Sequence, residues 1–342
     1  MRIGVLTGGG DAPGLNAAIR AVTRRAFQLG HDVSGIKNGW AGALAGDVSD
    51  LDPTHVRGIL PLGGTILGTS RTNPMKEPDG VARVRSTLQR FGVDGLVAIG
   101  GDDTLSVARA LHEGGFRVVG VPKTIDNDLS ATDFCIGFDT AVGIVVEGLD
   151  RLHTTASAHH RVMVVEVMGR DTGWVAWAGG IAGGADLIVI PEVPVEMDEV
   201  VRHLHRRRGE GKDFSIIVVA EGACFPGLDL DDGGAAADAF GHVQLARRGV
   251  GDALSRRIEH ETGFETRVTV LGHLQRGGTP SAVDRIWATR LGVAATELLD
   301  RGEAGVAPVR RHGDVVVVPL ADLVAETRRV PRGLYELTRV FH

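Results

Sequence analysis

Short runs of Val, Ile and Leu alternate along the chain with segments in which apolar residues recur at helical spacing. The apolar runs predict strands at residues 2–7, 32–38, 95–100, 117–123, 161–169, 187–191, 215–222 and 267–273. The helical spacing predicts helices at residues 16–29, 105–115, 141–159 and 173–184. Strands that are apolar throughout and separated by helices are typical of parallel sheets buried on both faces. We therefore expect an α/β fold with mainly parallel sheets.

Polar residues and glycines gather directly after these apolar runs. They lie at residues 8–11, 100–104, 123–128, 168–170, 221 and 273–276. In an open parallel sheet, ligands bind where loops leave the carboxyl ends of the strands. We expect the functional site at those ends.

The first strand is followed by the Gly turn of "LTGGGDAPGLN", residues 6–16. Backbone amides at Gly9 and Gly10 can cradle a phosphate at the start of a helix. The motif is not a Walker loop, because it lacks Gly-Lys-Ser/Thr at its end, and it is not a good dinucleotide fingerprint, because Gly8, Gly10 and Gly14 have one residue too many before the third Gly. An ordinary tight turn with Asp11 as a helix cap is the structural alternative. A second glycine-rich turn, at 63–74, carries Arg71 and suits a polyphosphate.

The motif "GGDDT" places two carboxylates at the end of a predicted strand. Gly101 allows close backbone approach, and Asp102 can ligate magnesium. Thr104 can cap the following helix or donate to a phosphate. A helix start with acidic residues explains one carboxylate well, but it explains the second, Asp103, less well.

The motif "PKTIDNDL" is the most specific of the set. Asp126 and Asp128 alternate in what we expect to be an extended segment, so both point the same way. Two carboxylates with Thr124 and Lys123 suit transfer of a phosphoryl group to a hydroxyl: one takes the proton and the other steadies the metal. The alternative is an Asx-rich turn.

Two later strand ends supply a set of cationic residues beside glycines: Arg161, Arg170, Arg267, His273 and Arg276. Any one of these arginines could sit in a surface salt bridge. Taken together, they favour a phosphate pocket.

The chain resembles the 6-phosphofructokinases over nearly its whole length. The segments that carry the resemblance occur in the family's order: "GGGDAPGLNAAIR", "GGDDT", "PKTIDND", "VVEVMGR", "IAGGAD" and "ETRVTVLGHLQRGG". The resemblance implies two similar three-layer α/β domains and a homodimer or homotetramer. Residues 1–138, completed by 275–310, would form the phosphoryl-donor domain, and residues 139–274, completed by 311–342, the fructose 6-phosphate domain.

The resemblance also implies roles for single residues. Asp126 would be the base for the 1-hydroxyl of fructose 6-phosphate, aided by Thr124 and Arg170, and Asp102 would serve Mg²⁺. The donor phosphates would lie along Gly9, Gly10, Arg71, Gly101, Asp103, Thr104 and Lys123. Fructose 6-phosphate would contact Thr124, Asp126, Asp128, Met168, Gly169, Arg170, Glu221, His273 and Arg276. Arg161 and Arg267 would reach it from the neighbouring subunit.

Asp103 and Lys123 point to pyrophosphate as the donor. ATP-using members similar to the bacterial type carry Gly at both positions, although some have Lys at the second, so Asp103 carries the argument. A Gly leaves room for the α-phosphate and ribose of a nucleotide, whereas an Asp fills that room with negative charge. At ~4 Å, two unit charges repel by roughly 4 kcal/mol at an effective dielectric of about 20. The alternative is an ATP-dependent enzyme in which the turn has moved.

The resemblance also bears on regulation. Positions that are basic in allosteric relatives read here as Arg20, Arg24, His153, Glu210, Lys212 and Asp213. Because two of them are carboxylates, we expect poor binding of anionic effectors and a non-allosteric enzyme.

Composition narrows the remaining choices. A net charge of -6 over 342 residues argues against broad nucleic-acid binding. Two cysteines in no metal-ligand pattern favour a reducing cytoplasm, and we expect neither a signal peptide nor a membrane helix. An NAD or lipid kinase, a dehydrogenase and a non-catalytic sugar-phosphate-binding protein are the wider alternatives. The first lacks "PKTIDND", the second fails on glycine spacing, and the third does not need Asp102 and Asp126.

Overall fold

The computed structural model describes residues 1–228, 230 and 249–341, and these fall into two compact units. The first unit contains Met1–Thr140 and Arg276–Thr327. The second contains the described residues from Ala141 to Gln275 and from Arg328 onward. Residues 311–327, which we expected in the second domain, lie in the first unit, because a strand at Asp314–Pro319 pairs there.

The first unit is built on a seven-stranded sheet with the order β11-β10-β5-β4-β1-β2-β3. The strands are β1 (Arg2–Thr7), β2 (Asp32–Ile36), β3 (Val48–Asp50), β4 (Gly95–Gly100), β5 (Val118–Pro122), β10 (Val306–Arg311) and β11 (Asp314–Pro319). All neighbouring pairs are parallel except those made by the two edge strands, β3 and β11. The parallel centre is buried on both faces, as the continuous apolar runs predict.

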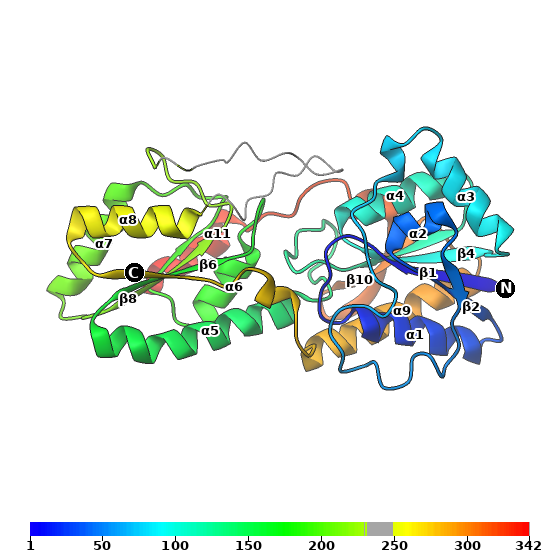
Figure 1. Ribbon diagram of the computed structural model, residues 1–342, viewed down its shortest axis with the longest axis horizontal. Coiled ribbons are helices and arrows are strands. Elements are labelled where there is room, and N and C mark those ends of the chain that lie inside the picture. The colour runs from blue at the N-terminus through cyan, green and yellow to red at the C-terminus, as the bar shows by residue number, and fades with distance from the viewer. Residues whose placement is uncertain (229, 231–248, 342) are drawn as a thin grey trace. The chain divides into compact units, whose positions relative to one another are not determined.

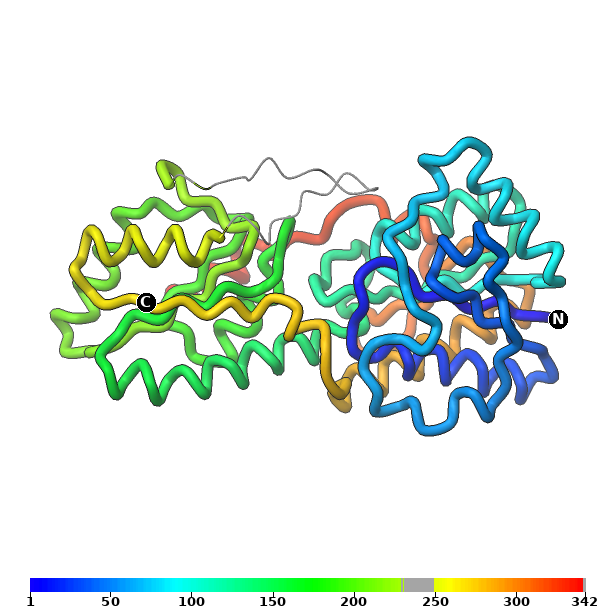
Figure 2. The backbone as a smooth tube through the Cα atoms, in the orientation of Figure 1, coloured from blue at the N-terminus to red at the C-terminus, as the bar shows by residue number. Residues whose placement is uncertain are grey.

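Helices cover both faces of this sheet (Figure 1). They are α1 (Leu15–Gln28), α2 (Gly39–Ala45), α3 (Gly80–Arg90), α4 (Asp102–Glu113), α9 (Ala282–Asp300) and α10 (Leu320–Leu323), with a short 3-10 turn, η1, at Pro74–Lys76. Helices α1 and α9 bury their apolar stripes on one face, and α2, α3 and α4 cover the other. Figure 2 shows α9 running beside α1, so a late segment of the chain completes the N-terminal core.

The second unit holds a smaller sheet with the order β7-β8-β6-β9, all parallel. Its strands are β6 (Val162–Val167), β7 (Leu187–Val189), β8 (Ser215–Ala220) and β9 (Thr266–Val270). Its helical elements are α5 (Phe138–His159), α6 (Trp174–Ala182), α7 (Met197–Gly209), α8 (Val250–Thr262), α11 (Arg332–Tyr335), η3 (Gly272–Arg276) and η4 (Glu336–Phe341). Helices α7 and α8 pack on one face, where they share an apolar core with β6, β7 and β8.

The predicted strands and helices are confirmed, with shifts at their ends. The second strand ends at Ile36 rather than at residue 38, because Asn38 takes a left-handed φ of 53° and begins a turn. The small, acidic and Gly-rich sequence of residues 225–244 predicts an exposed loop or insertion, and the structure describes only 225–228 and 230 of it. There Pro226 and Gly227 are exposed, whereas Phe225 is buried and Leu228 and Leu230 pack on the second unit's core.

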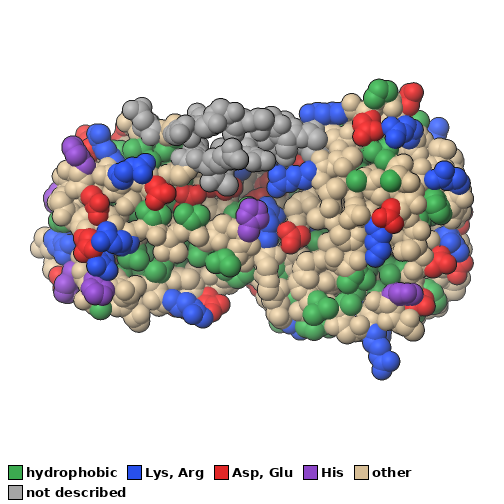
Figure 3. Space-filling model, in the orientation of Figure 1, with side chains coloured by type: hydrophobic (Ala, Val, Ile, Leu, Met, Phe, Trp, Pro, Cys, Tyr) green, Lys and Arg blue, Asp and Glu red, His purple; other side chains and the backbone are tan. Residues whose placement is uncertain are grey.

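Two features of the described residues concern membrane-spanning helices and the distribution of surface charge. No helix in the described part of the chain combines the length and apolarity needed to cross a bilayer. Figure 3 shows acidic and basic side chains interspersed among the described residues of the face that it draws.

The side chain of Asp284, on α9, bonds to residues at the start of α5, which belong to the first unit as far as Thr140. It is fully buried near the start of α9, and its carboxylate accepts the N–H groups of Gly137 at 2.7 Å and Thr140 at 2.8 Å. The hydroxyl of Thr140 donates to it as well. Burial raises the pKa of Asp284 to about 6 in spite of these bonds. The carboxylate therefore satisfies donors in the first turn of α5 that would otherwise be buried without partners.

We predict that Asp284→Ala lowers the free energy of unfolding by about 2–3 kcal/mol at neutral pH, because it strands buried donors. Denaturant unfolding of the full chain measures this. A raised folded-state pKa gives stability that is lost as pH rises through it, so the deficit should widen as pH falls from about 7 to about 4. The exposed Asp314→Ala serves as the control and should change stability by less than about 0.5 kcal/mol. Equal effects of the two substitutions would contradict this account.

Candidate active site

The glycine turn after β1 is fastened to the loop that carries Arg71. The Gly8 amide donates to Ile99 O at 3.0 Å, and the Gly9 amide donates to Ser70 O at 3.1 Å. In return, the Thr69 hydroxyl donates to Gly9 O at 2.6 Å. Gly9 has a φ of 77°, a conformation that favours glycine. The turn and the residue before Arg71 therefore lie together, as a shared phosphate site requires.

Thr104 lies between two glycines and is not a helix cap. A Cβ atom on Gly8 would lie 2.6 Å from the Thr104 hydroxyl oxygen, and one on Gly100 would lie 2.3 Å from its Cβ. Helix α4 begins at Asp102, with Gly101 as its N-cap, so the capping role that we considered for Thr104 is wrong, and its alternative role as a phosphate donor stays a prediction. The threonine side chain is buried, and it explains why glycines are required on both sides.

Asp102 and Asp103 occupy the first turn of α4, where carboxylates favour the positive end of the helix dipole. Asp102 is exposed and Asp103 is half-buried. The helix-start alternative is therefore part of the explanation for both residues. Helix α1, by contrast, has Gly14 as its N-cap, which excludes Asp11 from that role.

The Lys123 ammonium lies beneath the glycine turn. The side chain is 2% exposed, and Nζ donates to Gly8 O at 2.9 Å and to Gly10 O. A Cβ atom on Gly9 would lie 3.8 Å from Nζ, so the charge lies directly behind the turn. Burial, together with the Arg276 charge, lowers the pKa of Lys123 to about 7, while Asp11 and Asp126 oppose this shift. A phosphate held by this turn would lie beside a buried cation.

The carboxylates of Asp126 and Asp128 project from a turn, so the expected extended segment is wrong. Ile125 and Asp126 lie in the turn, and Asn127 is left-handed with a φ of 51°. The Asp126 amide donates to the Thr124 hydroxyl oxygen at 3.1 Å. The Asx-rich turn that we considered as an alternative is present, and it carries the carboxylates.

Asp128 lies in an environment that disfavours its ionised form. Burial raises its pKa to about 7, and the charges of Asp126 and Asp102 add to the shift, while a Thr124 hydrogen bond opposes it. A divalent cation would relieve this repulsion, so the oxygen donors fit Mg²⁺. Across the described residues, no three His, Cys, Asp or Glu side chains converge to hold a metal alone. Mg²⁺ usually takes one or two carboxylates plus phosphate oxygens and water, which this donor set allows.

Arg276 lies against the same glycine turn. A Cβ atom on Gly10 would lie 2.6 Å from its Nη1, which donates to Asp11 O at 3.0 Å. The structure thus brings Arg276 to the donor turn within the first unit. Its contact with the sugar phosphate stays a prediction.

In the second unit, the loops carrying the predicted sugar residues lie side by side. Pairing of β6 with β8 continues past the strands, with Glu221 N donating to Val167 O at 2.9 Å and Gly222 N to Gly169 O at 3.1 Å. A Cβ atom on Gly222 would lie 1.9 Å from Arg170 O. Only glycine at position 222 lets the Met168–Arg170 loop approach Glu221 this closely.

Arg161 and Arg267 share one carboxylate. Arg161 Nη2 lies 2.8 Å from Glu265 Oε1, and Arg267 Nη2 contacts the same oxygen. The hydrogen bond from Arg161 lowers the pKa of Glu265, and the two arginine charges add to this shift. The two guanidinium groups are therefore gathered at one end of β6 and β9. His273 is exposed in η3, in the same unit.

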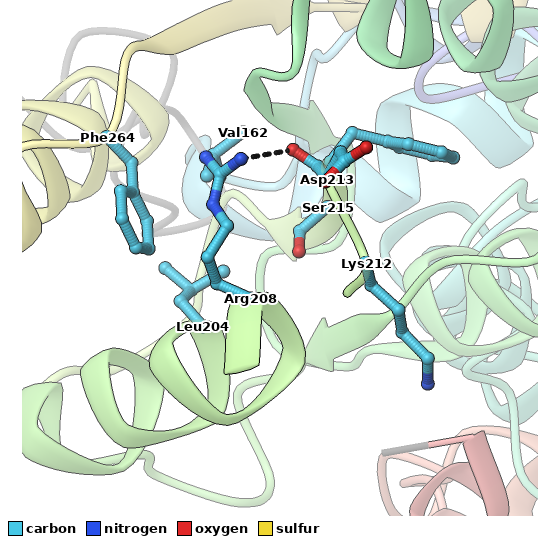
Figure 4. A pocket seen from close by; sticks show the side chains of 8 residues that line it. Val162, Leu204, Arg208, Lys212, Asp213, Ser215 and Phe264 are labelled. Carbon is cyan, nitrogen blue, oxygen red and sulfur yellow. Dashed lines mark hydrogen bonds between the residues drawn. The ribbon is translucent and has the colours of Figure 1, made fainter. Parts of the chain in front are cut away.

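A small pocket in the second unit is lined by Lys212 and Asp213, two of the positions that are basic in allosteric relatives (Figure 4). Arg208 donates to Asp213 O at 2.8 Å and lies 4.6 Å from the centre of the Phe264 ring. Lys212 pairs with Glu210 at 3.4 Å. Carboxylates and carbonyls of the chain itself thus engage cations of this region, and the weak binding of anionic effectors stays a prediction.

Sequence reasoning missed several residues that support the site. Asn16 is 2% exposed, and its side chain bonds to Leu62 O and Gly63 O and accepts the Ile66 amide, which holds the second glycine turn. Gln275 is fully buried and accepts the Met168 amide at 3.4 Å. A polar residue inside an apolar helical stripe was the available signal for Asn16. Gln275 stood within "HLQRGG", between two residues chosen for their charge.

Comparison with known proteins agrees with this geometry. The Phosphofructokinase family matches residues 2–299. A Streptomyces coelicolor protein named pyrophosphate--fructose 6-phosphate 1-phosphotransferase is 52% identical, covering 100% of this chain and 99% of that protein. Another from the same organism, named ATP-dependent 6-phosphofructokinase 3, is 49% identical and covers 98% of each.

Among solved structures, phosphofructokinase from Saccharomyces cerevisiae superposes with a TM-score of 0.82 at 34% identity. The match covers 95% of this chain and 45% of that longer one. Sequence similarity over the full length and fold similarity over nearly all of it point to the same family as the glycine turns and paired carboxylates. This chain belongs to the phosphofructokinase family.

Proposed function

We propose that the protein transfers a phosphoryl group from pyrophosphate to the 1-hydroxyl of fructose 6-phosphate, reversibly, giving fructose 1,6-bisphosphate and phosphate. The observation that carries this proposal is the arrangement in the first unit. A glycine turn backed by the buried Lys123 ammonium lies in the same unit as Asp128, on which the charges of Asp126 and Asp102 both act. One part suits a polyphosphate and the other a metal and a proton acceptor.

In the proposed reaction, Asp126 accepts the proton of the sugar 1-hydroxyl. The freed oxygen attacks the terminal phosphorus of pyrophosphate, and the bond from that phosphorus to the bridging oxygen breaks as inorganic phosphate leaves. Thr124 and Asp128 flank the phosphoryl group in transit, and Arg170 offers charge to it from the sugar-binding loop. Met168, Gly169 and Glu221 would hold the sugar.

Asp102 would hold Mg²⁺, with phosphate oxygens and water completing the shell. When bound, the ion neutralises phosphate charge, which favours attack by an oxygen nucleophile. The chain itself contributes the Asp102 carboxylate at the start of α4, fixed in place by the packing of Thr104 between Gly8 and Gly100.

Asp103 supports pyrophosphate rather than ATP as the donor. The relative named for pyrophosphate is 52% identical and the one named for ATP is 49% identical, so individual residues carry the assignment. Asp103 is the second residue of α4, at the helix end that adjoins the glycine turn. A carboxylate there would repel a third phosphate, and pyrophosphate has none.

The direct test compares initial rates with magnesium, fructose 6-phosphate and either pyrophosphate or ATP. We expect turnover with pyrophosphate and a kcat/KM for ATP that is at least about a hundredfold lower. This ratio corresponds to roughly 2.8 kcal/mol of repulsion, since each ~1.4 kcal/mol is a factor of ten. Turnover with ATP alone would overturn the donor assignment and leave the family unchanged.

The role of Asp103 is tested with two substitutions. Asp103→Gly removes both charge and volume, whereas Asp103→Asn removes only the charge. We expect Asp103→Gly to raise kcat/KM for ATP by roughly tenfold or more, since each ~1.4 kcal/mol of repulsion is a factor of ten. Asp103→Asn should raise kcat/KM for ATP by less. The difference between the two variants separates the effect of the Asp103 charge from the effect of its side-chain volume.

Adding Lys123→Gly to Asp103→Gly completes the series, although the loss of the Lys123 bonds to Gly8 and Gly10 will loosen the turn. An unchanged preference for pyrophosphate in every one of these variants would contradict the explanation.

We further propose that the enzyme is a homodimer or homotetramer in which Arg161 and Arg267 reach the 6-phosphate bound by a neighbouring subunit. Their shared contact with Glu265 supports a joint role, because both cations are gathered at one place. Loss of either should then damage a site that belongs to another chain.

Subunit complementation tests this arrangement. Asp126→Asn and Arg161→Ala should each lower activity strongly, Asp126→Asn by roughly 100-fold or more because the base is lost. Co-expressed, they should regain activity well above the sum of the two, since a hybrid contains one site with both intact residues. Asp126→Asn co-expressed with Asp102→Asn is the matched control. It should show no gain in activity, because both residues belong to the same subunit's site and no hybrid site contains both intact. Absence of any gain in the first pair would place Arg161 in its own subunit's site.

A further inference from the structure

Asn127 stands between the two catalytic carboxylates in a conformation that few residues adopt. Its φ is 51° and its side chain is 2% exposed. Asparagine tolerates the left-handed region better than most residues, and β-branched or bulky side chains are strained there. The direction in which the chain leaves Asp126 and enters Asp128 is therefore set at this residue.

The side chain of Asn127 closes a loop. Its Oδ1 accepts the Cys135 amide at 2.9 Å, and its Nδ2 lies 3.4 Å from Asp133 O, to which it donates. Both partners are backbone groups eight and six residues further along the chain. The carboxamide thus links the catalytic turn to the segment 133–135 within the first unit.

That segment is in turn fixed to the sheet. Asp133 N donates to Arg310 O at 2.8 Å, and Asp133 Oδ2 accepts the His312 amide at 2.7 Å. Phe134 forms an antiparallel bridge with Arg310. Since Arg310 belongs to β10 and His312 to the turn before β11, the far end of the Asn127 bonds is a rigid part of the fold.

We infer that Asn127 is a positioning residue, which aims the carboxylates of Asp126 and Asp128 by tying their shared turn to the segment 133–135. Asp126 and Asp128 are attached to the two peptide groups of Asn127, so a rotation there moves both at once. The inference rests on the proposed role of Asp126 as the base. Asn127 itself is given no contact with substrate.

The test measures kcat and both KM values of Asn127→Gly in the full-length enzyme, with pyrophosphate and fructose 6-phosphate. Glycine keeps the left-handed backbone and removes the carboxamide. We expect kcat to fall roughly 10- to 100-fold, because a displacement of about 1 Å at a reacting group costs about that much. Both KM values should stay within about threefold, since the phosphate and sugar contacts remain.

Asp79→Gly is the matched control, because Asp79 has a φ of 52°, is exposed at the start of α3 and makes no capping bond. It should leave kcat unchanged. A wild-type kcat in Asn127→Gly, or a rise in KM alone, would overturn the inference even if the unfolding temperature fell. Asp126→Asn, assayed in parallel, separates the two claims: if that variant kept full activity, the role of Asp126 would fail instead.

Discussion

The buried ammonium of Lys123 is the interaction on which the donor half of the site depends. A charge with 2% exposure must be satisfied by nearby groups, and here Gly8 O and Gly10 O accept from it. These bonds hold the glycine turn with its amides available and place a cation behind them. The same lysine lies two residues before the turn at Ile125 and Asp126, so the proposed phosphate site and the proposed base adjoin along the chain.

Close packing supports this arrangement from the other side. Thr104 fits between Gly8 and Gly100, which fixes the start of α4 and its two carboxylates against the turn. Any side chain at either glycine would collide with the threonine. Close packing of uncharged groups therefore helps to position the charged groups of the site, in addition to the electrostatic attraction between them.

Late segments of the chain hold the early ones in place. Strand β10 fastens residues 133–135, and through them Asn127, while Asp284 on α9 satisfies donors at Gly137 and Thr140. In the second unit, Gln275 bonds to the Met168 amide, and Glu265 gathers Arg161 and Arg267. The loops that carry the proposed site residues are therefore held by hydrogen bonds and ion pairs from residues to which no role in the reaction is assigned.

The sequence by itself determined the α/β architecture and the family, and it supplied the residues proposed to handle phosphate at the strand ends. Apolar periodicity depends on local side-chain pattern, and glycine, Asp and Arg at strand ends are visible without coordinates. It did not show that Thr104 packs instead of capping, that Asp126 and Asp128 leave a turn instead of an extended strand, or that Lys123 is buried. Those outcomes depend on groups distant in the chain, such as Cys135, Arg310 and Gly8. Only the tertiary structure brings such groups into contact, because hydrogen bonding and close packing act between atoms that sequence order does not place together.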